Sequence, residues 1–390
     1  MTASEPPLRG VRVLDLTRLV PGPVCTQHLA DLGADVVKIE DTGAGDYAPP
    51  ALRAIVNRNK RGLQLDLKQA EGAEAFLLLA RGADVVVEGF RPGAMERLGL
   101  GYAALAAVNP RIVCCSITGY GQSGPYRDRP GHDLNYCGHA GVADQNGAGA
   151  DTLALSNLPI ADLMGGALTA AMGILAALFD AARTGRGRPL DIAMADGALA
   201  HAVMPLATLA AHGSTRRAGA DTLTGGLACY ALYRTADQRF LAVGALERKF
   251  WDTLCDVIDC AHLKPLHRSG DAATEARVRT ELAAILGTRS CAEWEARFAH
   301  VDACVSPVHT LEEALADPHF RARGMVVESV HPTLGPLTQV ASPIRMTRHE
   351  FALHRHAPRP GEHTRELLRE AGCSEASIAA LLEKGVARAS

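Results

Sequence analysis

Residues 11–40 read VRVLDLTRLVPGPVCTQHLADLGADVVKIE, and the fold class follows from this stretch. It opens with a short apolar strand at 11–16 and closes with a second at 35–39. Between them, a Pro-Gly-Pro turn at 21–23 precedes a segment with the apolar spacing of a helix, 24–32. A strand, a helix and a second strand of these lengths predict a β-α-β unit with parallel strands.

The same alternation continues on the C-terminal side of that unit. Further apolar strands are expected at 63–67, 84–88, 111–117 and 190–194, with helical patterns between them. Strands that are apolar throughout and that alternate with helices are typical of a parallel sheet covered on both faces. We therefore predict a Rossmann-like, doubly wound α/β domain over residues 1–212.

The character of the chain changes after this domain. Residues 213–226 are polar and rich in glycine, which predicts a linker. Residues 227–325 carry two β segments, at 228–234 and 240–244, and then three helical patterns. We expect a smaller α+β domain there.

Composition disfavours several classes of protein. The 390 residues carry 40 basic and 43 acidic side chains, a net charge of −3 that provides no positive field for nucleic acid. The ten cysteines form no C-x-x-C pair and no zinc-ligand spacing with histidine, so we expect buried thiols and no metal. No signal sequence is evident, and the apolar stretch 163–179 is short for a membrane span, which predicts a core helix in a cytoplasmic protein without a membrane partner.

One motif matches a dinucleotide-binding fingerprint only in its letters. Residues 119–124 read GYGQSG, a G-x-G-x-x-G after a predicted strand. The fingerprint requires a helix to begin at once, so that backbone N–H groups face the pyrophosphate. Pro125 and the sequence YRDRPG follow instead, and they cannot continue a helix. We expect a ligand-facing loop here and no NAD site.

Residues 131–136, GHDLNY, are a stronger indication of a functional site than the glycine motif. They place an imidazole, a carboxylate, an amide and a phenol in one segment that we expect to be non-helical. Asp162 stands directly before the apolar stretch, and Glu247 follows the strand expected at 240–244. Taken alone, Asp162 could be a helix N-cap and His132 a hydrogen-bonded loop residue. The pattern by itself leaves structural and catalytic roles open.

The chain as a whole resembles the family III CoA-transferases, the group that also contains α-methylacyl-CoA racemase. The similarity runs nearly from end to end and rests on matched segments in the same order. They are PGP at 21–23, DLGADVVKIE at 31–40, NKR at 59–61, LDLK at 65–68, EGFRPG at 88–93, GYGQSGP at 119–125, GHDLNY at 131–136, ADL at 161–163, GG at 225–226, VGALE at 243–247 and DACVSPV at 302–308.

The resemblance implies an assembly that the sequence pattern does not. In this family, two chains with a large and a small domain interlock as a homodimer. Each active site lies between the large domain of one chain and the small domain of the other. Residues 213–226 would then cross between subunits, and residues 326–390 would return to the large domain.

Within the family, two reactions use the aspartate that matches Asp162. In the racemase, this aspartate and the histidine of GHD, here His132, move protons at the α-carbon of a 2-methylacyl-CoA through an enolate. A glutamate matching Glu247 hydrogen-bonds that histidine. In the transferases, the aspartate attacks the thioester and forms a mixed anhydride, and CoA passes to a carboxylic acid. Because all three racemase residues are present, we favour the racemase reaction and keep CoA transfer as the alternative.

The resemblance also indicates how acyl-CoA is held. The expected CoA and substrate contacts are Arg91, Leu65, Asp66, Leu67, Lys68, Gly131, Asp133, Asn135 and Tyr136. Four more basic side chains lie on loops that follow predicted strands or helices, where a doubly wound sheet binds its ligands. These candidates to pair with CoA phosphates are Arg53, Arg58, Lys60 and Arg61. Racemases carry a CoA-contacting arginine where Asp41 stands here, which puts that contact in doubt. No cofactor besides the CoA of the substrate is implied.

Overall fold

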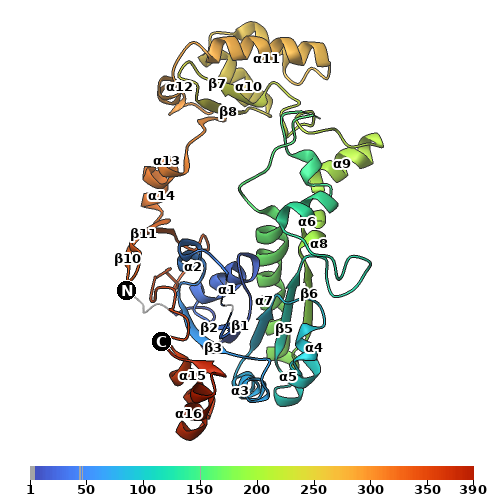
Figure 1. Cartoon of the computed structure of the whole chain (residues 1–390). Helices are drawn as coiled ribbons and strands as arrows, with labels where there is room; N and C mark the ends of the chain where they lie inside the picture. Colours follow the sequence, from blue (N-terminus) through green and yellow to red (C-terminus); the bar gives the residue numbers. More distant parts are fainter. Residues whose placement is uncertain (1–4, 44, 46, 150) are drawn as a thin grey trace. The chain divides into compact units, whose positions relative to one another are not determined.

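The computed structural model describes residues 5–43, 45, 47–149 and 151–390. Its backbone divides into two compact units, which are described separately (Figure 1). The larger unit takes the chain up to Ala140, then Asn157–His201 and Arg321–Ser390, and the second takes Gly141–Ser156 and Ala202–Phe320.

A seven-stranded sheet forms the centre of the larger unit. Its order is β12-β3-β2-β1-β4-β5-β6, with every neighbouring pair parallel except β12 and β3. The order from β3 to β6 is that of a doubly wound fold. The strands are β1 (Arg12–Asp15), β2 (Asp35–Glu40), β3 (Lys60–Leu65), β4 (Val85–Glu88), β5 (Val113–Thr118), β6 (Pro189–Ala193) and β12 (Ala387–Arg388).

The predicted parallel sheet is confirmed. All six expected strands form, and β3 is displaced most, since it begins at Lys60 and not at residue 63. In the middle of the sheet, Val13 of β1 lies between Val36 of β2 and Val85 of β4. All three side chains are buried, which explains why these strands are apolar on both faces. The two-residue edge strand β12 was not predicted.

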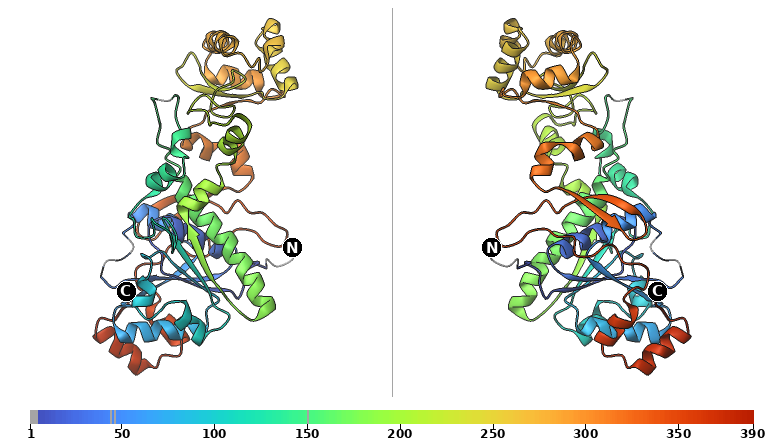
Figure 2. Two further views of the ribbon diagram at one scale, coloured as in Figure 1. Left: turned by 90° about the vertical axis from the view of Figure 1, so that its right-hand side faces the viewer. Right: turned by 90° about the vertical axis from the view of Figure 1, so that its left-hand side faces the viewer.

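Helices cover both faces of the sheet (Figure 2). On one face, Phe76, Leu105, Leu367 and Leu381 join the apolar side chains of β1 to β4 in one core. They come from α3 (Ala70–Arg81), α5 (Tyr102–Val108), α15 (Thr364–Glu370) and α16 (Glu375–Glu383). On the other face, α1 (Pro21–Asp31) contacts β1, β2 and β4, while α7 (Thr169–Thr184) contacts β5 and β6.

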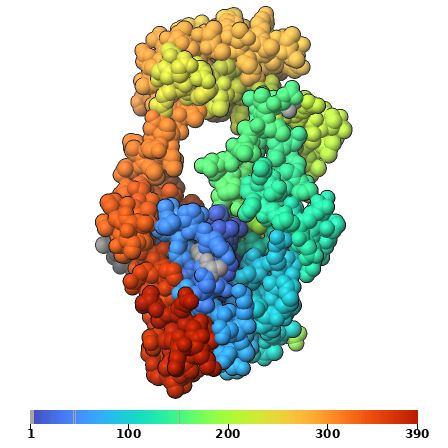
Figure 3. Space-filling view, in the orientation of Figure 1, coloured from blue at the N-terminus to red at the C-terminus, as the bar shows by residue number. Residues whose placement is uncertain are grey.

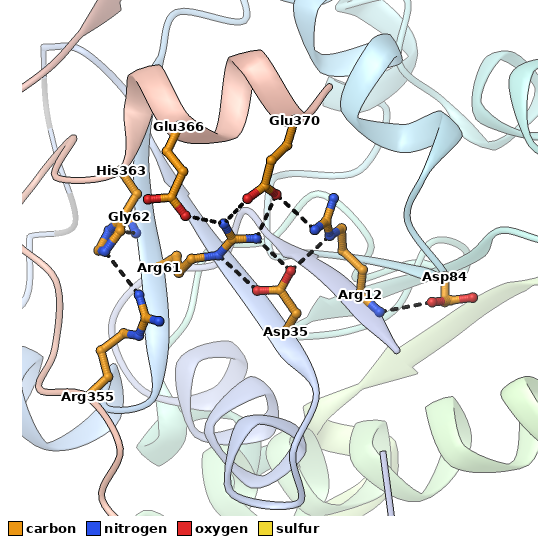
Figure 4. A network of polar contacts seen from close by, with 9 residues as sticks. All are labelled: Arg12, Asp35, Arg61, Gly62, Asp84, Arg355, His363, Glu366 and Glu370. Carbon is orange, nitrogen blue, oxygen red and sulfur yellow. Dashed lines mark hydrogen bonds and ion pairs between the residues drawn. The ribbon is translucent and has the colours of Figure 1, made fainter. Parts of the chain in front are cut away.

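An ionic network holds the C-terminal segment to the first strands of the sheet (Figure 4). The Arg61 guanidinium contacts Asp35 at 2.6 Å and both Glu366 and Glu370 at 2.7 Å. Arg12 contacts Asp35 and Glu370 at 2.9 Å each. In the space-filling view, the red C-terminal residues accordingly lie against blue residues of the same unit (Figure 3).

The second unit is built on the antiparallel sheet β7-β8-β9. Trp251, Leu254, Leu282 and Trp294 pack with these strands in a separate core. The helices and strands of this unit are η1 (Ala143–Gln145), α9 (Val203–His212), β7 (Tyr230–Arg234), β8 (Phe240–Gly244), α10 (Arg248–Val257), η3 (Ala261–Leu266), α11 (Ala272–Leu286), α12 (Cys291–Phe298), β9 (Val305–Pro307), α13 (Leu311–Ala316) and α14 (Pro318–Ala322). The last two residues of α14 already belong to the larger unit.

The boundaries of the units differ from the expected ones. Residues 141–156 and α9 group with the second unit, although we expected both in the large domain. Contacts with the expected linker explain this grouping. A Cβ atom on Gly219 would lie 2.6 Å from the carbonyl oxygen of Ala148, and the Thr208 hydroxyl donates to Asp221 at 2.7 Å.

Helix α7 is buried on one face only, whereas we expected a core helix. Most of its inward-facing residues are alanines. The large side chains of Met172, Leu175 and Phe179, and that of Leu168 directly before the helix, are exposed at a spacing that places them on one side. Met172 is 66% and Phe179 67% exposed. Together with the preceding helical turns it spans Ala161–Thr184, which is long and apolar enough to cross a membrane, with 39% of its most apolar window buried.

The remaining elements of the larger unit connect the strands and surround their carboxyl ends. They are α2 (Pro50–Val56), α4 (Ala94–Arg97), α6 (Asp133–His139), η2 (Ala161–Leu168), α8 (Met194–Ala200), β10 (Val326–His331) and β11 (Gly335–Val340).

Candidate active site

A cavity of about 690 Å³ opens at the carboxyl ends of the central strands. Its walls are the loop after β1 (residues 17–22), the loop after β4 (89–92) and the end of β5 (117–120). His132 and Asp162 also line it. Since the strand order reverses between β1 and β4, this is where doubly wound folds bind their ligands.

A buried cluster of charged side chains binds the backbone of the loop after β1. Lys60 Nζ donates to Asp15 Oδ2 and to the carbonyl oxygen of Pro23, both at 3.0 Å, and the Thr17 N–H donates to Asp15 at 2.9 Å. Asp15 and Lys60 are 0% exposed. Burial alone would raise the pKa of Asp15, but Lys38 and Lys60 beside it hold that pKa well below its ordinary value. The cluster therefore fixes both ends of the loop.

Lys60 is one of four cations that we expected to be available for CoA phosphates, and the structure engages all four elsewhere. Arg53 pairs with Glu40, Arg58 with Asp31, Lys60 with Asp15 and Arg61 with Asp35. The phosphate role assigned to them was wrong because their charges are already neutralised by carboxylates of the same unit.

Asp162 lies in the first turn of a helical segment in which the turns are widened to π-helix, η2. Such turns are rare and are frequent at functional sites. Close backbone packing accompanies this geometry, because a Cβ on Gly165 would lie 2.5 Å from the carbonyl oxygen of Met194. The Asp162 N–H donates to Asp133 Oδ1 at 3.0 Å. Asp162 is thus inside the helix and is not its N-cap, the role that an ordinary structural explanation required.

The Asp162 carboxyl is electrostatically perturbed. Burial and the nearby negative charge of Asp133 raise its pKa to about 6, against the opposing influence of His132. Within the described part of the chain, that carboxyl accepts no hydrogen bond and forms no ion pair. A cavity-lining carboxyl that can hold or release a proton near neutral pH is suited to acid–base chemistry.

The GHDLNY segment is helical, contrary to expectation, because residues 133–139 form α6. His132 occupies the N-cap position, and its backbone N–H donates to Asn135 Oδ1 at 3.0 Å. The amide of Asn135 therefore helps to start the helix, in the way that a glutamate does in a capping box. The His132 side chain is exposed and lines the cavity with Asn135.

Tyr136 explains two of the glycines. Its ring is buried beneath the cavity wall, and its hydroxyl donates to the carbonyl oxygen of Gly131. A Cβ on Gly119 or on Gly131 would lie 2.4 or 2.6 Å from the ring. Burial raises the pKa of Tyr136 to about 12, so the phenol stays protonated. The chain from 119 to 132 runs in loops and turns, as Pro125 predicts.

A second cavity of about 340 Å³ adjoins the first and shares Arg18, Tyr47 and Phe90 with it. The predicted contacts Leu65, Leu67 and Lys68 line it. The remaining apolar lining residues are Leu16, Ile39, Ala94 and Leu98.

The predicted binding residues divide into lining and supporting groups. Arg91 lines the larger cavity, and one of its terminal nitrogens donates to the carbonyl oxygen of Asp128 at 3.0 Å. Asp66 instead accepts from the Lys68 N–H at 3.0 Å near the start of α3, and Asp133 accepts the Asp162 N–H. In the structure, Asp66 and Asp133 position neighbouring residues.

Glu247 belongs to the second unit, where it stands between β8 and α10 at the N-cap position. Its predicted hydrogen bond to His132 stays a prediction. The same unit brings ligand atoms of Cys260, His262 and Glu281 within 4.8 Å of one another. A hydrogen bond of 2.6 Å between His262 Nε2 and Glu281 accounts for part of this proximity.

Comparison with known proteins agrees with this site. The family described as CoA-transferase family III matches residues 8–364. The chain is 37% identical to human alpha-methylacyl-CoA racemase over 375 residues, 95% of each chain, and 32% identical to human succinyl-CoA:glutarate CoA-transferase, covering 97% of this chain and 90% of that one. A solved CAIB/BAIF family protein from Brucella suis superposes with a TM-score of 0.82 at 28% identity, covering 94% of this chain and 99% of that one.

The chain therefore belongs to CoA-transferase family III, as its sequence motifs indicate. It is an enzyme of the superfamily that contains both racemases and CoA-transferases.

Proposed function

We propose that this enzyme inverts the α-carbon of 2-methylacyl-CoA thioesters by proton transfer through an enolate, with Asp162 and His132 as the two proton carriers. The observation that carries the proposal is the Asp162 carboxyl, which lines the cavity with His132 and has a pKa raised to about 6. A carboxyl that exchanges its proton near neutral pH can give or take the α-proton at little cost, and an imidazole that lines the same cavity can serve as the second proton carrier, which inversion requires.

Each residue then has a defined task. One of the two groups removes the α-proton from one face of the carbon, and the other returns a proton to the opposite face. Asp133 supports Asp162 through the backbone N–H that it accepts and through the negative charge that keeps the carboxyl basic. In the homodimer proposed below, a glutamate at position 247 of the other chain would accept the second N–H of the His132 ring and orient it.

CoA transfer is the second candidate. The observation in its favour is that an Asp162 carboxyl free of hydrogen bonds is also placed to attack a thioester carbonyl. Relatives named as CoA-transferases match this chain at 32% identity, close to the 37% of the racemase. Both reactions use the same cavity and the same CoA thioester.

Deuterium incorporation distinguishes the two reactions. The enzyme is incubated with a 2-methylacyl-CoA in deuterated water, without any carboxylic acid. Inversion requires ionisation of the α-carbon, so we expect deuterium at that carbon and convergence of the two epimers, followed by NMR and chiral chromatography. Lack of deuterium across several 2-methylacyl chains, together with CoA exchange once a free acid is supplied, would establish transfer and reject the racemase proposal.

We further propose that the enzyme is a homodimer that completes each site with residues of both chains. An exposed apolar row supports this, because a single chain leaves its large side chains in water. The row consists of Leu168 at the end of η2 and of Met172, Leu175 and Phe179 on α7. A second copy that covers the row would remove that surface from solvent.

The dimer proposal gives a measurable mass. Light scattering should find twice the 41.1 kDa of one chain at micromolar concentration. Phe179→Asp should shift the population to monomer or aggregate and remove activity, since a buried unpaired charge costs several kcal/mol. Arg186→Asp, just beyond the end of α7, is the matched control and should leave the mass unchanged. A fully active wild-type monomer would exclude the shared site.

A further inference from the structure

Three side chains that can ligate a metal ion converge in the second unit, where η3 meets α11. The sulfur of Cys260, a ring nitrogen of His262 and a carboxylate oxygen of Glu281 all lie within 4.8 Å of one another. The ligand atoms of tetrahedral zinc are about 3.3–3.6 Å apart, because zinc–ligand bonds measure about 2.0–2.3 Å. Side-chain shifts of about 1 Å would therefore let one zinc ion contact all three groups.

The backbone holds Cys260 in a fixed position. Helix α10 ends at Val257, and Asp259 takes the left-handed conformation, with φ of 59°, that commonly follows the end of a helix. The Cys260 N–H then donates to the carbonyl oxygen of Cys255 at 2.8 Å, and its own carbonyl oxygen accepts the Leu263 N–H at 2.9 Å. Because both polar groups of its backbone are bonded, the side chain of Cys260 starts from a defined point.

The other two side chains also lie on regular elements. His262 is on η3, and the Trp251 indole fixes this element by donating to the carbonyl oxygen of Leu263 at 3.1 Å. Glu281 is on α11, next to Leu282, which is fully buried in the core of the unit. A hydrogen bond of 2.6 Å already joins His262 Nε2 to Glu281. Ligands that are held in this way lose little conformational freedom when a metal binds.

The charges around these side chains favour a cation. Glu281 pairs with no lysine or arginine in the part of the chain that the structure describes. Lys264, on the same 3₁₀ helix as His262, is paired with Asp256 at 2.6 Å. Glu281 and Asp259 both place negative charge beside the Cys260 sulfur. A divalent cation would offset the repulsion between these groups.

An ordinary surface pair explains only two of the three side chains. His262 and Glu281 are 63% and 38% exposed, as is common for such pairs. Cys260 is only 6% exposed, and among the described residues its thiol makes no hydrogen bond, yet its sulfur lies close to both partners. Thiolate, imidazole and carboxylate together are a donor set that zinc accepts, whereas calcium and magnesium prefer oxygen ligands.

We propose that Cys260, His262 and Glu281 bind one zinc ion, with water as the fourth ligand, and that the ion links the end of α10 to α11. The thiol loses its proton to solvent on binding, and the resulting thiolate and the carboxylate balance the charge of Zn²⁺. Neither proton transfer nor CoA transfer at Asp162 requires this ion. The site departs from our expectation of no metal, which rested on zinc motifs with paired ligands, whereas Glu281 lies nineteen residues beyond His262.

Zinc titration of the metal-free, untagged enzyme in a non-chelating reductant tests the proposal. Calorimetry should find one site per chain with a Kd of about 1 µM or lower, which excess Mg²⁺ does not displace. Cobalt bound in place of zinc should give the absorption band of a cobalt–thiolate bond. Zinc should also raise the midpoint of thermal unfolding, and a chelator should reverse the increase.

Substitution of each ligand should weaken the site. His262→Gln and Glu281→Gln should each raise the Kd of zinc by about 10- to 100-fold or more, because one of three protein ligands is lost. Cys260→Ser should remove the cobalt–thiolate band. Since the first two substitutions alter exposed side chains, they test the site without disturbing the core of the unit.

Two matched variants control for zinc bound by other thiols and imidazoles. His309→Gln replaces a histidine whose ring nitrogens lie 4.0 Å from Glu295 and from Asp317. Cys373→Ser replaces a partly buried thiol of the larger unit. Neither should change the affinity for zinc or the cobalt spectrum. The assignment would be overturned if wild type bound no zinc, if both His262→Gln and Glu281→Gln bound it as wild type does, or if Cys373→Ser removed the cobalt–thiolate band.

Discussion

Replacing Asp162 by asparagine should lower α-proton exchange by about 10²- to 10⁴-fold and should make the protein more stable at pH 7.5. The loss of rate follows because an amide can neither take nor give the α-proton. The gain in stability follows because the Asp162 carboxylate is partly buried beside the like charge of Asp133, which raises its pKa to about 6. A variant that loses function and gains stability is typical of an active-site group held in an unfavourable environment.

The sign of this stability change depends on pH. An aspartate with a pKa of about 6 in the folded state and 3.8 in the unfolded state is penalised as a carboxylate above pH 6. The penalty declines as the pH falls through this window and is gone below pH 3.8. We expect Asp162→Asn to gain about 1–3 kcal/mol at pH 7.5, and clearly less at pH 4.5, in thermal or urea unfolding.

A matched substitution controls for a general effect of charge removal. Asp128→Asn removes an exposed carboxylate that pairs with Arg127 at 3.1 Å, and the effect of this substitution on stability should be small at either pH. If Asp162→Asn proved less stable than wild type at pH 7.5, the carboxylate would be a stabilising group, and the acid–base role inferred from its raised pKa would fail.

Replacing His132 by glutamine should divide the reaction into its two halves. Asp162 remains able to remove the α-proton of the epimer that presents it to the carboxylate, so that epimer should still exchange deuterium with retention. The other epimer should lose exchange, and inversion should fall by about 10²- to 10⁴-fold, because the second proton carrier is missing. NMR of each pure epimer in deuterated water measures both effects in one experiment.

Glu247→Gln is the comparison for this variant. A residue that orients His132 without moving the proton should lower deuterium exchange of both epimers by a similar and smaller factor. The difference between the epimers that is expected in His132→Gln should therefore not appear. Equal loss from both epimers in His132→Gln would contradict two opposed proton carriers and would favour reaction at Asp162 alone.

The sheet could be predicted from the sequence because its strands are apolar on both faces, a pattern that few other structures produce. Helix α6 could not be predicted, because GHDLNY has no apolar periodicity. Its first turn depends on the Asn135 amide bound to the His132 N–H, and its packing on the Tyr136 ring beneath Gly119. The second of these contacts joins residues that are distant in the chain, and local sequence does not report it.

The basic residues that we expected to bind phosphate also show that local sequence does not report long-range contacts. Position after a strand or helix made Arg53, Arg58 and Arg61 candidates for phosphate binding, but their partners decide their role. Arg58 binds Asp31, which lies 27 residues away, and Arg61 binds Glu370, which lies 309 residues away. Arg18 follows the first strand directly and so has the same position in the sequence pattern, but no motif marks it. Only the structure shows that, among the described residues, its guanidinium contacts aromatic rings and no carboxylate.

The C-terminal helices also govern when the larger unit can be finished during protein synthesis. Leu367 and Leu381 help to cover one face of the sheet, and Arg61 finds Glu366 and Glu370 only after these residues have been made. At 5–20 residues per second, a ribosome that has completed β6 needs roughly ten to thirty seconds to reach α15. Throughout that interval, part of the apolar face of the nascent sheet stays exposed, because the C-terminal helices that cover it have not yet been synthesised. Slow translation or premature termination should therefore increase aggregation and demand for chaperones more in this enzyme than in a protein whose large domain is continuous in sequence.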